Sequence, residues 1–403
     1  MKKRRPVKRK KRSKGRRKFN INIKAILFSL VAIAFVVYVV YFLVVFLGIE
    51  TVDPVAQNIA SHAILSQESS DMEKTLFIFE KETDEARRIS DVYVLFENKR
   101  KGISLLVYVP GNMYFDGLEE EFGSSISISS LRYAGDFLQE GRGVEYTLWQ
   151  LSEIMGFRVH NYVWITTEAY EKMIDIYGET SPPRERDRLN FQSLVGGDPA
   201  DSFFGLYMFS SNVSNLKTFF NVNQIGDLNE QIFSNMSFVS VLQKVRNLRR
   251  NVERTQSYAL DVGRPAFSIE KFSEKGGIVR SLNVWEYDKA LRDYVFRMID
   301  RGLEQERVRI EVYNATDIAG RALIYSRKIQ NSGCDVVRFG NAPGDYERTK
   351  VFVSDRDQFR NSLRVVSDVL LGRFELLEER PSFMTTGDIV IILGDDIAQT
   401  EIF

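Results

Sequence analysis

The sequence predicts a membrane-anchored α/β (α+β) protein with one N-terminal transmembrane helix, a mixed-sheet α/β domain and a small β-α-β-β-α-β C-terminal domain. Three observations predict this fold class. Residues 25–49 carry no charged side chain. Farther along the chain, short runs of β-branched and aromatic residues alternate with segments of helical periodicity. Between residues 308 and 393 these signals follow the order strand, helix, strand, strand, helix, strand, which is typical of a small α/β sandwich with its helices on one face.

The anchor is expected at residues 25–49, because a helix of that length exceeds a hydrocarbon core of roughly 30 Å. Residues 1–20 hold thirteen Lys or Arg and no acidic residue. The positive-inside rule therefore keeps residues 1–24 in the cytoplasm and sends the rest of the chain outside. A cleaved signal peptide is the alternative, but the apolar run is too long and residues 50–54 offer no small-x-small cleavage site.

Charge and rare residues exclude several functions. Beyond residue 49 the chain has 41 basic against 54 acidic residues, a net charge of about −13 that argues against nucleic acid as a partner. The basic tail would also suit a nucleic-acid patch, but topology and attraction to anionic lipid explain it. With one cysteine, Cys334, and two histidines, His62 and His160, the sequence offers no disulfide, zinc cluster or catalytic triad.

Residues 50–74 are polar and weakly periodic and are expected to form a stalk, and residues 75–263 form the first α/β domain. Its expected strands and helices can be given by range. The strands are expected at residues 76–80, 92–96, 103–109, 157–166 and 258–262, and the helices at 144–155, 168–177 and 238–248. Residues 184–226 have no readable pattern.

Residues 264–305 are expected to be a connector with an amphipathic helix that packs between the domains, since Leu291, Val295, Met298 and Ile299 share helical spacing. Residues 306–398 form the C-terminal domain. Its expected strands lie at residues 308–313, 336–338, 350–353 and 389–393, and its helices at 319–330 and 355–371. A capping box is expected at Ser354 and Asp357.

The C-terminal domain resembles the one that accompanies LytR-CpsA-Psr proteins. The resemblance rests on the strand 308–313 followed by Asn314 and Ala315, then Gly320 and Ala322 in a helix, Gly333 before the next strand, and the acidic segment 387–396. Asn314 can satisfy backbone groups at a turn, Gly320 allows close helix–sheet approach, and Gly333 supplies a positive φ.

The preceding region is similar to the LytR-CpsA-Psr catalytic domain at two strands. Residues 90–95 resemble the strand that opens with an acidic residue, and residues 104–110 resemble the strand that leads into an Ile-Pro-Arg-Asp motif. The resemblance implies a bacterial envelope enzyme outside the membrane that transfers glycopolymer phosphates from a polyprenyl pyrophosphate carrier to peptidoglycan, typically with Mg²⁺. Such chemistry needs Arg for the pyrophosphate and acids for the metal.

The chain departs from this pattern at the positions where the resemblance implies the phosphate-binding and metal-binding side chains. Gly111 and Asn112 stand where the family has Arg and Asp, and residues 204–243 contain no Arg and only one Lys. Asp91 is the one family-like acid that remains, as a weak catalytic and metal candidate beside the reading of an exposed strand-end acid. Substitute phosphate contacts could come from four further weak candidates, whose alternative reading is a solvated surface: Arg132, Arg184, Arg186 and Arg188.

The leading hypothesis is an extracytoplasmic, single-pass envelope protein that is non-catalytic or weakly active and binds envelope polymer, polyprenyl carrier or a partner protein. On this hypothesis no cofactor is expected. The first alternative is an active Mg²⁺-dependent glycopolymer phosphotransferase that uses the candidates above. The second is a scaffold whose C-terminal domain is an interaction module.

Overall fold

The computed structural model describes residues 23–55, 61–83, 86–115, 126–177, 192–193, 217–228, 231–251, 256–272 and 276–400. The chain forms two compact units, Met1–Gly48 and Ile49–Phe403, which are described separately. Within the first unit, α1 spans Ile23–Leu47, close to the predicted residues 25–49. By length and composition α1 can cross a membrane, with a mean hydropathy of 3.0 over its best window.

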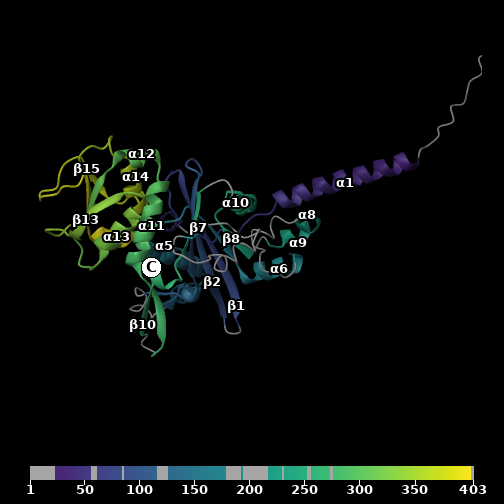
Figure 1. The fold of residues 1–403 in the computed structure, drawn as a ribbon, viewed down its shortest axis with the longest axis horizontal. Coiled ribbons are helices and arrows are strands. Elements are labelled where there is room, and N and C mark those ends of the chain that lie inside the picture. The colour runs from purple at the N-terminus through teal and green to yellow at the C-terminus, as the bar shows by residue number, and fades with distance from the viewer. Residues whose placement is uncertain are drawn as a thin grey trace, which may run out of the picture. The chain divides into compact units, whose positions relative to one another are not determined.

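The second unit is built on three sheets, so the predicted α/β class with mixed sheets is confirmed (Figure 1). Sheet A has the order β7-β9-β3-β2-β1-β6-β8. Its strands are β1 Met72–Thr83, β2 Ala86–Asn98, β3 Ile103–Pro110, β6 Asn161–Ile165, β7 Gln192–Ser193, β8 Ile232–Ser234 and β9 Gln256–Asp261. Sheet B has the order β10-β11-β4-β5, with β4 Tyr114–Phe115, β5 Ile126–Ser127, β10 Ser268–Phe272 and β11 Ile278–Leu282.

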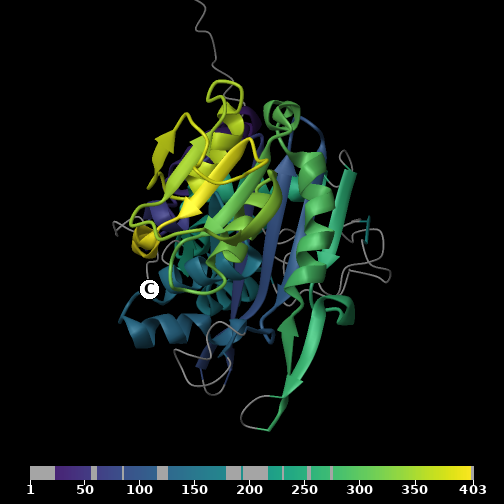
Figure 2. The same ribbon diagram turned by 90° about the vertical axis from the view of Figure 1, so that its left-hand side faces the viewer.

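Sheet C belongs to the C-terminal domain and has the order β13-β12-β16-β14-β15. Its strands are β12 Arg309–Asn314, β13 Asp335–Asn341, β14 Lys350–Val353, β15 Glu375–Leu377 and β16 Ile389–Leu393. The helices of the second unit are α2 Ser61–Ile64, α4 Leu131–Leu138, α5 Gly143–Met155, α6 Thr167–Tyr177, α8 Lys217–Phe220, α9 Val222–Gly226, α10 Phe238–Asn251, α11 Val284–Met298, α12 Arg301–Glu306, α13 Arg321–Gln330 and α14 Arg360–Val369. Figure 2 shows sheet C with α11 beside it and the β10–β11 hairpin projecting below.

Sheet A is covered on both faces, and the alternation of its side chains separates them. We call one the α5 face, because Val94 and Trp164 pack there with Leu148 of α5 in one buried cluster that also includes Leu291 of α11. We call the other the α6 face; it carries Phe77, Phe79 and Tyr93, and α6 and α10 cover it (Figure 1). On that face Lys244 of α10 forms ion pairs with Glu73 and Glu97 at 2.8 and 2.6 Å.

Local signals at the ends of elements explain much of this fold. Gly156 ends α5 with φ +69°, as expected for a C-cap glycine, and its N–H bonds to Ser152 O at 2.9 Å. Asn314 forms the predicted turn, accepting from Thr316 N at 3.2 Å. Gly333 has φ +102°, as predicted. Gly320 has φ +85° and open space where a Cβ would stand, so its role is conformational and the predicted close helix–sheet approach is wrong.

The predicted stalk at residues 50–74 is wrong, because this segment packs into the second unit. Val55, Ile64 and Met72 are almost fully buried. Val52 forms a β-bridge with Phe233 of β8. The apolar residues of this segment are spaced irregularly and follow neither a helical nor a strand period, so their burial could not be seen in the sequence.

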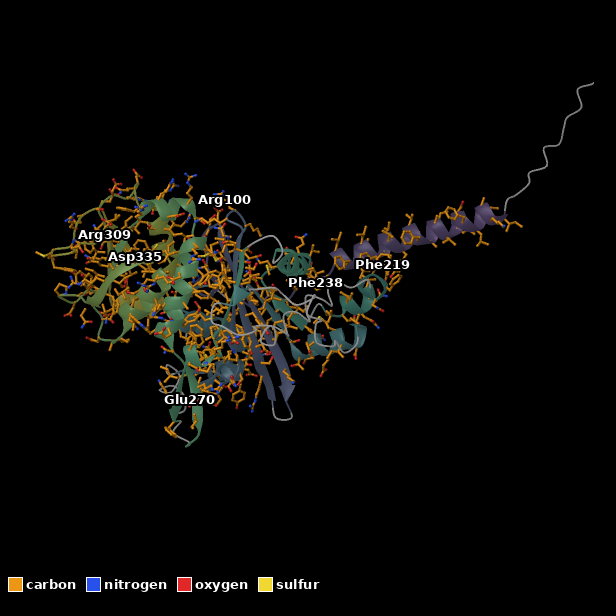
Figure 3. All side chains as sticks on the ribbon, in the orientation of Figure 1. Arg100, Phe219, Phe238, Glu270, Arg309 and Asp335 are labelled. Atoms are coloured by element: carbon orange, nitrogen blue, oxygen red, sulfur yellow. The ribbon has the colours of Figure 1, made fainter. Side chains whose placement is uncertain are left out.

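Two other expectations need correction. The connector 264–305 contains the predicted helix, α11, but also the β10–β11 hairpin, which lacks a clear apolar alternation. Figure 3 shows Glu270 on this hairpin and Arg309 and Asp335 in the C-terminal domain. The expected capping box is wrong, since α14 begins at Arg360 and Ser354 Oγ donates to Asp388 O instead. The domain boundaries proposed from the sequence stay predictions.

Polar contacts, most of them at least partly buried, join the C-terminal domain to the rest of the second unit. Asp368 of α14 forms an ion pair with Arg158 at 3.3 Å. It also accepts hydrogen bonds from Ser66 Oγ and Gln67 N, both at 2.8 Å. From α11, Asp288 pairs with Arg327 of α13 at 2.6 Å. The segment before β1 and helix α11 therefore both contact the C-terminal domain.

Candidate functional site

Tyrosine and carboxylate side chains meet at one end of sheet A, on the α6 face. Asp91 of β2 lies opposite Pro110 of β3, and Tyr108 of β3 lies opposite Asp261 of β9. Tyr108 Oη donates a hydrogen bond of 2.8 Å to Asp91 Oδ1. Arg264 follows β9, and its Nε lies 3.5 Å from Asp261 Oδ2. We call Asp91, Tyr108, Asp261 and Arg264 the acid–tyrosine cluster.

The cluster is half-buried and carries more negative than positive charge, with two carboxylates against one guanidinium. Burial raises the pKa of Tyr108 well above its ordinary value, and the charge of Asp91 and its hydrogen bond raise it further. Burial and the same carboxylate raise the pKa of Tyr170 on α6. Both tyrosines are therefore neutral hydroxyl groups at neutral pH, able to donate and accept hydrogen bonds.

Gly111, where the resemblance implies an Arg, lies immediately after β3. A Cβ on this residue would stand 2.1 Å from Ile89 O and 2.8 Å from Ser90 O. The backbone is held in this position on both sides, because Gly111 N donates to Ser90 O at 3.0 Å and Ser129 N donates to Gly111 O at 2.7 Å. No side chain fits here without moving β2 or the segment before α4.

Asn112, where the resemblance implies an Asp, is exposed in the turn that follows β3. Its side chain is a neutral amide, which can hydrogen-bond to a hydroxyl group but adds no negative charge for a metal ion. The end of β3 therefore provides neither the cation nor the anion that the resemblance implies.

Arg132 lies on the other side of sheet A from Asp91. Its Nη1 forms a 2.5 Å ion pair with Glu80 of β1, and its guanidinium lies 5.8 Å from the ring centres of Trp164 and Phe233. Trp164 belongs to the α5 face, whereas Asp91 neighbours Tyr93 across Val92 and lies on the α6 face. The sheet thus separates Asp91 and Arg132, which the sequence had grouped as one substitute site.

Arg184, Arg186 and Arg188 lie outside the described residues. In the described part of the chain no three His, Cys, Asp or Glu side chains gather as a metal site would require. Asp91 already accepts from Tyr108, and Asp261 accepts from Gly263 N at 3.0 Å and pairs with Arg264. A Mg²⁺ ion here would therefore have at most these two protein carboxylates and would need water or substrate oxygens for the rest of its octahedral set.

Sequence reasoning found Asp91 but missed Tyr108, Asp261 and Arg264. Tyr108 and Asp261 are separated by about 150 residues, and only the parallel pairing of β3 with β9 brings them together. The one available signal was position in the predicted strands. Asp261 lies near the end of one predicted strand, and Asp91 lies just before the start of another. The order of the strands in sheet A was needed to place Asp91 and Asp261 at the same end of the sheet.

Comparison with known proteins identifies the C-terminal domain. Residues 307–396 match the LytR_C family, described as LytR cell envelope-related transcriptional attenuator. The resemblance found in the sequence is confirmed for this domain: residues 307–396 form a LytR C-terminal domain, a family described as cell-envelope-related. No curated protein matches the chain.

Several solved structures are similar in fold. Bacillus subtilis TagV is 12% identical, with 57% of this chain and 98% of that chain covered and a TM-score of 0.38. Lin1025 from Listeria innocua is 11% identical, with coverages of 57% and 100% and a TM-score of 0.37. A structure of TagT bound to LI-WTA is 10% identical, with coverages of 62% and 97% and a TM-score of 0.36. At these values the likeness carries no argument about function.

Proposed function

We propose that this chain is a non-catalytic envelope protein, anchored by α1 with its N-terminus in the cytoplasm, that binds an envelope glycan at the acid–tyrosine cluster. Gly111 carries the proposal. Its backbone leaves no room for the arginine that would hold a pyrophosphate. Phosphoryl transfer depends mainly on positioned cations that stabilise the developing charge, so their loss removes the main source of catalysis.

The chemistry of the cluster supports a ligand rich in hydroxyl groups. Carboxylates and tyrosine hydroxyls bond well to sugar hydroxyls, and the exposed amide of Asn112 adds a further donor and acceptor. A pyrophosphate would instead meet the charges of Asp91 and Asp261 with Arg264 as the one cation of the cluster. The cluster therefore favours the glycan part of an envelope polymer over the phosphate part of its carrier.

The test is co-sedimentation of the full chain, in lipid nanodiscs, with purified cell-wall sacculi. We expect binding that falls at least tenfold in the double variant Tyr108→Phe/Asp91→Asn, which keeps the size of both side chains. Asp355→Asn, on the turn before α14, serves as the matched control and should bind like the wild type. Metal-dependent cleavage of a polyprenyl pyrophosphate by the wild-type chain would overturn the non-catalytic part of the proposal.

Topology has a separate test. Met384 is 91% exposed and Cys334 is buried, so Met384→Cys places a single reactive thiol on the surface. A membrane-impermeant maleimide should label this variant in intact cells, with the wild-type chain as the background. Labelling that appears only after the cells are permeabilised would place the second unit inside.

A further inference from the structure

A groove of about 990 Å³ lies between α14 and β15 in the LytR C-terminal domain. On one side it is lined by α14 and the turn before it, including Arg356, Arg360 and Leu363. On the other side it is lined by Phe374, Leu376 and Glu378. These three residues are two apart, so they point to the same face of the strand, toward the helix.

Strand β15 forms an open edge of sheet C beside this groove. It pairs only with β14, in parallel, with Leu376 opposite Val351. Glu375 N donates to Thr349 O at 2.9 Å, so the main chain of Glu375 points toward the sheet. Because main-chain groups alternate along a strand, the N–H and C=O of Leu376 point outward, where no other strand of the described chain pairs with them.

An open edge next to a helix is the geometry used for β-strand addition. An added strand makes main-chain hydrogen bonds to the edge, and every second side chain enters the groove between strand and helix. Here the groove has an apolar floor, because Leu363, Phe374 and Leu376 are only partly buried. The other face of sheet C is packed with its own cluster, in which the rings of Phe383 and Tyr313 meet edge to face.

The charges along the groove select among possible ligands. Arg356 in the turn before α14 and Arg360 at the first position of the helix are both exposed, and neither forms an ion pair within the described residues. Arginine binds carboxylates through paired hydrogen bonds. The groove also presents Asp357 and Glu378, which would repel a continuous polyanion. This mixture suits a peptide with an apolar stretch and a carboxylate better than a phosphate polymer.

We propose that this groove binds an extended segment of a partner protein, which adds as a strand to β15. The added segment places apolar side chains against Phe374 and Leu376 and a carboxylate against Arg356 and Arg360. This site lies in the C-terminal domain, away from the acid–tyrosine cluster, so a test of peptide binding does not depend on the proposed glycan site.

Selection of a phage library of random dodecapeptides on the full chain in nanodiscs tests the proposal. Two variants remove separate parts of the site. Leu376→Pro deletes the outward N–H, which an edge strand tolerates, and Arg360→Glu reverses an exposed charge. Leu376→Val and Arg301→Glu are the controls, since the first keeps the N–H and the second changes an exposed arginine outside the groove.

We expect enriched peptides whose affinity falls at least tenfold in Leu376→Pro and in Arg360→Glu but not in either control. Since Arg360→Glu leaves the strand unchanged, it remains informative if the proline variant unfolds. Absence of enrichment, or peptides that bind all variants equally, would overturn the proposal. So would binding of long-chain inorganic polyphosphate that depends on Arg360 but not on the Leu376 N–H, since this would indicate a polyanion site.

Discussion

The two domains of the second unit differ in what their family-like residues do. In the C-terminal domain these residues shape the backbone: Asn314 forms a turn, and Gly333 adopts φ +102°. In the first domain the resemblance implies charged residues at the end of β3, but Gly111 and Asn112 stand there and form a tight turn. The comparison teaches that the residues that shape a backbone and the residues that would carry charge are different ones, so a match in one domain does not decide the chemistry of the other.

The first prediction concerns a substitution at the contact between the two domains. Asp368→Ala removes the buried partner of Arg158 and the acceptor of Ser66 and Gln67, so it should lower the free energy of unfolding by about 3 to 5 kcal/mol. Chemical denaturation of the full chain in micelles measures this loss. Asp357→Ala, exposed before α14, should change stability by less than about 0.5 kcal/mol. A loss below about 1 kcal/mol for Asp368→Ala would show that the two domains do not depend on this contact.

The second prediction concerns the same junction and pH. Burial, followed by the charge of Lys74, lowers the pKa of His160 from 6.5 to about 4, although Asp368 and Glu73 oppose the shift. The unfolded chain thus takes up the proton first, and stability should fall as pH drops from 6.5 toward 4. The loss should approach about 3 kcal/mol.

Unfolding measured across this pH range, in the wild type and in His160→Asn, gives the test. Asparagine can still accept the hydrogen bond of 3.1 Å that Lys74 N donates to His160 Nδ1, but it does not titrate. The difference in stability between the two proteins should therefore change with pH as stated. A pH-independent difference would contradict the assignment.

The third prediction tests the turn after β3. Gly111→Ala places a Cβ 2.1 Å from Ile89 O, and relieving this clash should cost about 1 to 3 kcal/mol. Thermal unfolding of the full chain measures the effect. Gly340→Ala, where a Cβ would meet open space, should change stability by less than about 0.5 kcal/mol. Equal stability of the two variants would mean that position 111 can accept a side chain.

The smallest effect is expected for Asn112→Asp, which introduces the acid that the resemblance implies at this position. Since Asn112 is exposed, its stability should stay within about 0.5 kcal/mol of the wild type. Without a cation at position 111 the variant should release no phosphate from a polyprenyl pyrophosphate with Mg²⁺. Appearance of that activity would show that an acid at position 112 is enough for catalysis without an arginine at position 111.

The elements that local patterns define could be predicted from the sequence. Helix α5 with Gly156, the three long strands of sheet A and α11 follow from periodicity and turn residues. The edge strand β15 was missed because its three residues give no alternation. The packing of residues 50–74 was missed because it depends on contacts such as Tyr162 Oη with Asp53, which join distant segments.

The candidate site was harder to predict from the sequence than these elements. Asp91 could be found in the sequence as an acid at the end of a strand. Its separation from Arg132 could not, because it depends on the two residues lying on opposite faces of sheet A. A single register step decides that face. Asp261 joins the cluster only through the pairing of β3 with β9. Sequence patterns report local structure, whereas a site assembled from three strands depends on sheet order.

The most direct test of the non-catalytic account is a calorimetric titration of the full chain, in nanodiscs, with a short-chain polyprenyl pyrophosphate in the presence and absence of Mg²⁺. The account predicts no Mg²⁺-dependent binding, because position 111 holds no cation and the nearby carboxylates are engaged by Tyr108, Gly263 and Arg264. Binding that requires Mg²⁺ would contradict it and would show that a working pyrophosphate site exists despite Gly111 and Asn112.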